Sequence, residues 1–164
     1  MRTKESDRSP FRDHVLDKNA LLTFAPHSLP MLLETKAETR LATLEWHTKN
    51  ILLIRFKREL PMDLAGVEEV LSERVRMCSG CKVGVLVVLP EDMDADIRVS
   101  VTDHGVWVDD ITFAEATVGP LVYQTRMADL YYAHFPQSFP TAIFTSEEEA
   151  LAWLERIMEG EAGE

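Results

Sequence analysis

The stretch Cys81–Leu89, CKVGVLVVL, constrains the fold most strongly. From Val83 to Leu89 every residue is Val or Leu except Gly84, and Pro90 follows directly. A short β-branched run between turn residues is typical of a strand that is buried on both faces. Such a strand needs a covering layer on each side, so we expect an α/β protein in which helices cover a sheet.

The segments before this strand predict a hairpin and then a β-α-β unit. Extended runs at 41–46 and 51–57 are separated by polar residues, which is typical of an antiparallel hairpin. Apolar residues recur every three or four positions between Asp63 and Cys78, with Asp63 as a candidate N-cap and Gly80 after the end. The expected buried stripe of this helix is Leu64, Val67, Leu71, Val75 and Cys78.

Residues 90–110 have two interpretations. The sequence RVSVTDHGVWVDD alternates around a turn at 103–105, which favours a hairpin. The β-α-β rhythm on either side favours an irregular helix over 93–105, or an irregular crossover, with Ile97, Val101 and His104 on one face. We favour the helix or irregular crossover.

The last third predicts strand, helix, strand and helix. We expect strands at 111–118 and 141–144 and a helix over 121–135, with Pro120 at its start. The final helix begins after a capping box, either Thr145 with Glu148 or Ser146 with Glu149, and we expect Gly160 to close it. Its expected buried residues are Ala150, Leu151, Leu154, Ile157 and Met158.

Length and charge limit the organisation and the partners. The 164 residues suit one domain, and we place an N-terminal extension at 1–36, the domain at 37–160 and a tail at 161–164. The extension could hold a short amphipathic helix over 11–22. A net charge of -11 disfavours nucleic-acid and anionic-membrane partners. We see no transmembrane segment and no signal peptide, so we expect a cytoplasmic protein with reduced cysteines.

Catalytic, metal and cofactor signatures are weak throughout, so we name no catalytic residue, no metal ligand and no cofactor. Cys78 and Cys81 form a C-x-x-C motif, but at the end of a helix, where the helix dipole raises a thiol pKa. We therefore expect ordinary thiols. Four carboxylates cluster after the central strand without the spacing of a calcium loop, and we interpret them as a solvated acidic turn: Glu91, Asp92, Asp94 and Asp96.

The order of elements, with ILLI at 51–54, VGVLVV at 83–88 and FTSEEEALAWL at 144–154, resembles small bacterial STAS-like proteins. This SpoIIAA-like group is related to anti-sigma-factor antagonists and to the Sec14 fold. The resemblance covers about residues 38–158 and implies a mixed sheet: an antiparallel hairpin followed by parallel β-α-β units, covered by helices. Regulatory members carry a phosphorylatable Ser after the third strand. Residues 89–96 have no hydroxyl there, so we expect no such switch.

The resemblance implies a non-enzymatic regulatory or protein-interaction module, with a homodimer as one expected form. The alternative is a carrier of a small apolar ligand in the Sec14 manner, and a third hypothesis is an enzyme with an acidic metal site at 91–96. A pocket lined by Tyr and Met would favour the carrier, and a flat apolar patch would favour the interaction module.

The helix at 121–135 has more apolar residues than one covered face requires. Thr125, Ala128, Tyr132 and Phe135 form one stripe, which we expect to face the sheet. Tyr and Met are common where an apolar surface must adapt or stay partly wet. We therefore predict that a second group forms or borders the contact surface for a partner subunit or an apolar ligand: Tyr123, Met127, Tyr131 and His134.

Overall fold

The computed structural model describes residues 34–161. The predicted helix at 11–22 and nearly all of the predicted extension and tail lie outside the described residues. Strands are β1 (Lys36–Glu38), β2 (Ala42–Thr48), β3 (Ile51–Phe56), β4 (Pro61–Met62), β5 (Val83–Val88), β6 (Asp94–Ala95), β7 (Thr112–Val118) and β8 (Thr141–Phe144). Helices are α1 (Leu64–Cys78), α2 (Ile97–Ser100), α3 (Val122–His134) and α4 (Glu147–Glu161), with 3₁₀ turns η2 (Gly105–Trp107) and η3 (Asp109–Ile111).

Six strands form one mixed sheet in the order β1-β2-β3-β5-β7-β8, which confirms the predicted fold class. The pairs β1–β2 and β2–β3 are antiparallel, and β3–β5, β5–β7 and β7–β8 are parallel. The first strand, β1, was not predicted, because three residues are too few to show an alternating pattern. A separate two-residue ladder joins β4 to β6.

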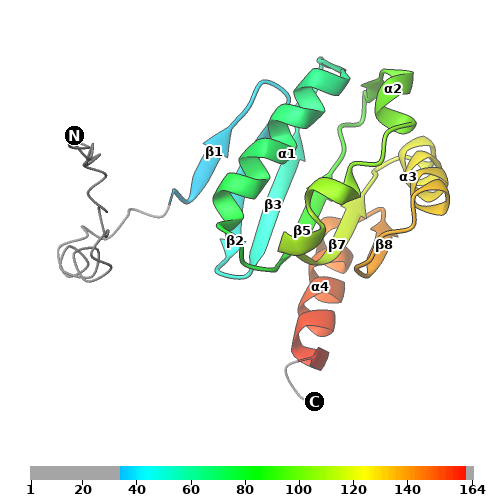
Figure 1. Cartoon of the computed structure of the whole chain (residues 1–164). Helices are drawn as coiled ribbons and strands as arrows, with labels where there is room; N and C mark the ends of the chain where they lie inside the picture. Colours follow the sequence, from blue (N-terminus) through cyan, green and yellow to red (C-terminus); the bar gives the residue numbers. More distant parts are fainter. Residues whose placement is uncertain (1–33, 162–164) are drawn as a thin grey trace, which may run out of the picture. The chain divides into compact units, whose positions relative to one another are not determined.

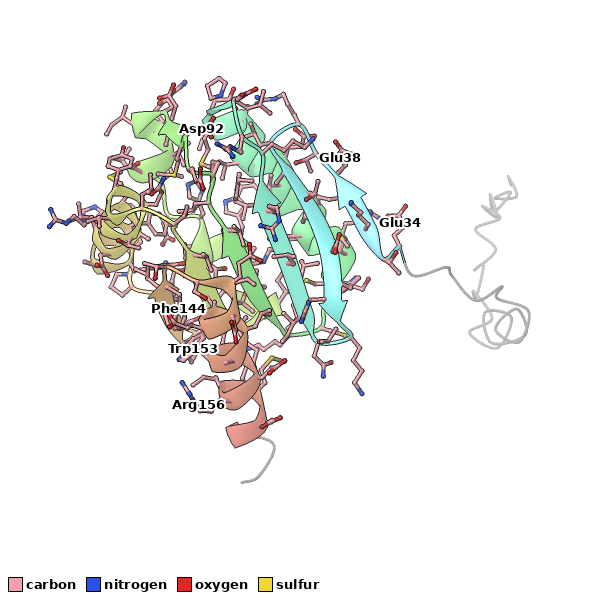
Figure 2. All side chains as sticks on the ribbon, turned by 180° about the vertical axis from the view of Figure 1, so that it is seen from behind. Glu34, Glu38, Asp92, Phe144, Trp153 and Arg156 are labelled. Atoms are coloured by element: carbon pink, nitrogen blue, oxygen red, sulfur yellow. The ribbon has the colours of Figure 1, made fainter. Side chains whose placement is uncertain are left out.

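Helices cover the two faces of the sheet unequally. In Figure 1, α1 lies across the near face and α4 lies behind the sheet. Figure 2, seen from behind, shows α4 over the β8 side, with Trp153 of α4 beside Phe144 of β8, while Glu38 lies on the far edge strand. The rings of Trp153 and Phe144 have centroids 5.9 Å apart. Two cores result, one under α1 and one under α4.

Helix α1 begins where the sequence predicted. The Asp63 carboxylate accepts a hydrogen bond from the Gly66 amide at 2.8 Å, as an N-cap does. The helix ends at Ser79 and Gly80, which both adopt positive φ angles. The predicted stripe was partly wrong: Val75 is 40% exposed, whereas Val70 and Arg74 are buried. An apolar stripe of 3.6-residue period can be drawn at more than one angle around a helix, and this one is rotated toward Arg74.

The hairpin interpretation of residues 90–110 was wrong, and the irregular crossover was correct. The four-residue α2 and the turns η2 and η3 connect β5 to β7. The alternation was misleading because Val101, Val106 and Trp107 are exposed instead of facing a sheet partner. In the crossover from β3 to β5, by contrast, α1 has fifteen residues.

The last helix follows its sequence signals closely. The Glu149 amide donates to the Ser146 hydroxyl at 3.4 Å, in agreement with one of the two predicted caps. Ala150 and Leu154 are fully buried against the sheet, as predicted. The helix continues through Gly160 to Glu161, so Gly160 does not close it. No helix among residues 34–161 is both long enough and apolar enough to cross a bilayer.

Candidate functional site

The short crossover between β5 and β7 leaves a cavity of about 190 Å³ above the sheet. Strands β3, β5 and β7 line it from below, and α1, α2, α3 and the turn at Gly105 line it from the sides and above. A four-residue helix covers less of a sheet than a full helix does, which explains why side chains do not fill this space. The space is therefore a consequence of the topology at this crossover.

The walls of the cavity are mainly apolar. Aliphatic residues of α1 and of the strands line it together with methionine and aromatic side chains from several elements. Methionine thioethers are flexible and polarizable, so they adapt to the shape of a guest. The methionine and aromatic residues that line the cavity are Met62, Met93, Met127, Tyr131, Tyr132 and Phe139, together with Phe56.

A polar network centred on Glu115 forms part of the lining. Arg74 Nη1 donates to Glu115 Oε2 at 2.8 Å, and Arg74 Nη2 donates to the Thr112 hydroxyl at 2.5 Å. The Tyr132 hydroxyl donates to Glu115 Oε1 at 2.8 Å and lies 2.9 Å from the Thr117 hydroxyl. The Arg74 and Glu115 side chains are 3% and 13% exposed, so this is a buried ion pair.

A register irregularity in the sheet brings this network together. Between Val83 and Gly84 the pairing of β5 with β7 shifts by one residue. An extra residue in one strand re-aims its side chains. Thr112 and Glu115, which regular alternation would place on opposite faces, therefore both contact Arg74. Among the described residues, Arg74 Nε is the buried side-chain nitrogen without a hydrogen-bond partner.

Tyr131 and His104 form the rim between α3 and the crossover. The His104 amide donates to the Tyr131 hydroxyl at 2.8 Å, and the two rings stack with centroids 5.9 Å apart. Burial raises the pKa of Tyr131 to about 12. Burial, and then the charge of Glu115, raises the pKa of Tyr132 well above its usual value. Both phenols are thus neutral at physiological pH and can donate a hydrogen bond.

The structure divides the four predicted contact residues into two pairs. Met127 and Tyr131 are half-buried and line the cavity. Tyr123 is 54% exposed and His134 is exposed, and neither lines the cavity.

The stripe predicted to face the sheet, Thr125, Ala128, Tyr132 and Phe135, was wrong in part. Gln124 and Ala128 are the buried residues of α3. Gln124 is buried because its side-chain amide donates to the carbonyls of Pro90 and Glu91 at 3.1 and 2.9 Å.

The polar residues of the cavity were missed by the sequence analysis. One signal could have found part of them: Glu115 interrupts the apolar strand ITFAEATV. Charged residues at buried positions are nearly always paired. Glu115 therefore indicates a cationic partner, but the helix at 64–78 offers both Arg74 and Arg76, and the sequence does not choose between them.

The acidic residues after β5 have separate partners. Glu91 pairs with Arg58 at 3.3 Å, and Asp92 accepts from the Glu59 amide at 2.7 Å. Asp96 caps α2 and binds Arg98, whose hydrogen bonds lower the pKa of Asp96 to about 2. Within residues 34–161, no three metal-ligating side chains come together. The geometry thus adds nothing in favour of the metal-enzyme hypothesis.

The two cysteines lie on either side of a tight turn. The Cys81 amide donates to the Cys78 carbonyl at 3.0 Å. Cys78 is 3% exposed, and burial raises the pKa of its thiol, whereas Cys81 is exposed. A raised thiol pKa lowers the fraction of the reactive thiolate.

We expect iodoacetamide to alkylate Cys81 at least about tenfold faster than Cys78 in the native protein, because Cys78 is both shielded and less ionised. Timed alkylation followed by peptide mass spectrometry measures the two rates. In denaturant the rates should become nearly equal. Faster native alkylation of Cys78 would contradict the prediction of ordinary thiols.

Comparison with known proteins places this chain in a family and a fold. A model of the family described as "Domain of unknown function (DUF7793)" matches residues 45–158. The solved structure of an uncharacterized DUF3478-family protein with a SpoIIAA-like fold, from Shewanella loihica PV-4, matches with a TM-score of 0.50 and 14% identity. The match covers 69% of this chain and 91% of that one. No curated protein matches the sequence. The SpoIIAA-like fold confirms the resemblance, and the chain belongs to the DUF7793 family.

Proposed function

We propose that this domain binds a small, mostly apolar ligand in the cavity between the sheet, α1 and α3. The observation that carries the proposal is the combination of apolar walls with a few convergent polar groups, centred on the Arg74–Glu115 pair. Ligand sites commonly combine an apolar lining with a few placed polar groups. Tyr and Met side chains line the cavity, which is the feature that favours a carrier over an interaction module.

The volume limits the size of the ligand. A cavity of about 190 Å³ is smaller than the roughly 300–1,000 Å³ of sites for drug-sized molecules. An engineered apolar cavity of about 150 Å³ accepts benzene. The ligand that fits this space without rearrangement is therefore one ring or a short branched chain.

We expect toluene to bind the protein and to protect it from thermal unfolding, and we expect Ala128→Leu to abolish both effects. Ala128 is 8% exposed and lines the cavity, so a leucine there would occupy the space of the guest. The measurement is a toluene titration followed by ¹H–¹⁵N NMR, with the melting temperature of each sample as a second readout.

The matched control is Ala133→Leu, which makes the same change on an exposed position of the same helix. This control should bind toluene as the wild type does. Failure of toluene to perturb the amides around the cavity in the wild type would contradict the proposal, as would unchanged binding in Ala128→Leu.

A second candidate function is protein interaction of the STAS-like kind, and exposed apolar side chains favour it. They lie on the crossover and on α3: Ile97, Val101, Val106, Trp107, Leu121, Val122, Tyr123 and Leu130. Large apolar groups exposed in such number often mark contact surfaces. Native mass spectrometry of the purified protein separates the two candidates, since a retained small molecule favours the carrier and a dimer favours self-association.

A further inference from the structure

We infer that the ligand is a neutral, ring-sized molecule with one hydroxyl or N–H group, and that it donates this hydrogen to the Glu115 carboxylate. This inference rests on the proposed function. The same cavity would bind ligands of this chemical class in preference to others of the same size.

Glu115 has hydrogen-bonding capacity that the protein does not use. A carboxylate offers about four lone-pair directions. Two donors reach it, Arg74 on Oε2 and Tyr132 on Oε1, each at 2.8 Å, and no third donor reaches it within residues 34–161. Glu115 lines the cavity, and its side chain is 13% exposed. A ligand that brings a hydrogen-bond donor can therefore use an acceptor that is already in place.

The charges around the cavity favour a neutral guest over an ionic one. Arg74 and Glu115 line it and pair with each other, and His104 is the described histidine in the lining. An added anion would meet Glu115 and an added cation would meet Arg74. Either ion would also lose its hydration shell against apolar walls, which is costly without a counter-ion.

The methionine and aromatic residues that line the cavity favour an aromatic body for the ligand. Met62, Met93 and Met127 line the space together with Tyr131 and Phe139. Thioether sulfur and aromatic edges both make favourable contacts with a ring. A phenol combines such a ring with one donor, so p-cresol is the probe that matches this site.

The test compares three probes of one shape by NMR titration: toluene, p-cresol and 4-methylbenzoate. We expect p-cresol to bind about tenfold tighter than toluene, since a hydrogen bond to a charged acceptor is among the stronger ones. We expect 4-methylbenzoate to bind more weakly than p-cresol. The preference for p-cresol over toluene should fall below about threefold in the double variant Arg74→Met/Glu115→Leu, which removes the acceptor together with its counter-ion.

The outcomes separate this inference from the proposed function. Equal affinity for toluene and p-cresol would overturn the inference, and the apolar cavity would still stand as a binding site. Tighter binding of 4-methylbenzoate would also overturn it, because Arg74 would then act as an anion site. Binding of none of the three probes would overturn the proposed function itself. The comparison of probes on the wild-type protein needs no variant to fold.

Discussion

Substitution of Arg74 by methionine is expected to lower the free energy of unfolding by about 3–5 kcal/mol. The change keeps the apolar stem and removes the guanidinium, so Glu115 is left buried without its counter-ion. Thr112 also loses the Arg74 donor, which contacts it at 2.5 Å. Urea unfolding at neutral pH, followed by circular dichroism, measures the loss.

Two controls identify the cause of this loss. The double variant Arg74→Met/Glu115→Leu should recover most of the stability, because replacing a buried pair by apolar residues is often neutral or stabilising. Arg55→Met removes a partner of Glu147, which Arg55 Nη1 contacts at 2.6 Å in an exposed ion pair. Exposed pairs contribute about 0–1 kcal/mol, so this variant should be nearly as stable as the wild type. Similar losses in Arg74→Met and Arg55→Met would contradict the interpretation of Arg74–Glu115 as a buried pair.

The regular elements of the fold could be predicted because each has a local cause. β5 is a continuous apolar run, α1 has an N-cap and a positive-φ end, and α4 has a Ser146 cap and an apolar stripe. Each of these signals involves only a few neighbouring residues, so it can be recognised in a single sequence. The parallel order of the central strands follows because helices connect them.

The candidate site could be predicted only in part, because its causes are not local. Met127 and Tyr131 were selected as surplus apolar residues of one helix, and they do line the cavity. The cavity itself depends on how much of the sheet the short crossover from β5 to β7 covers. No residue pattern in the sequence predicts that extent. The Arg74–Glu115 pair joins positions 41 residues apart and depends on a shift in strand register.

The region at 97–111 shows why an alternating pattern can mislead. Alternation predicts a strand only where one face is buried and the other is not. Here the large side chains of Ile97 and Val106 are 72% and 69% exposed. The pattern of valine and polar residues was real, but the segment pairs with no strand, and its buried hydrophobic residues, Val108 and Ile111, do not follow the alternation. The segment instead spans the cavity, where its exposed apolar groups lie outward.

Leu154→Ala is expected to destabilise the protein by about 2–5 kcal/mol, which is the second large effect. Leu154 is fully buried in the core between α4 and the sheet. At Gly84 a Cβ would lie 3.5 Å from Leu154 Cδ2 and 2.7 Å from Met158 Sδ, so α4 packs closely against β5 there. The backbone and the β-strand neighbours of Leu154 can move only a little into the space left by the deleted side-chain atoms. Most of that volume should therefore remain as a cavity.

Leu130→Ala is the matched control, since it makes the same truncation on another helix at a position that is 67% exposed. It should change the free energy of unfolding by no more than about 0.5 kcal/mol. Urea unfolding of both variants under one set of conditions gives the comparison. A cost for Leu130→Ala equal to that for Leu154→Ala would mean that the outer face of α3 is covered in solution. In that case the exposed apolar side chains of α3 would belong to an interface, and sedimentation of the wild type should then show a dimer.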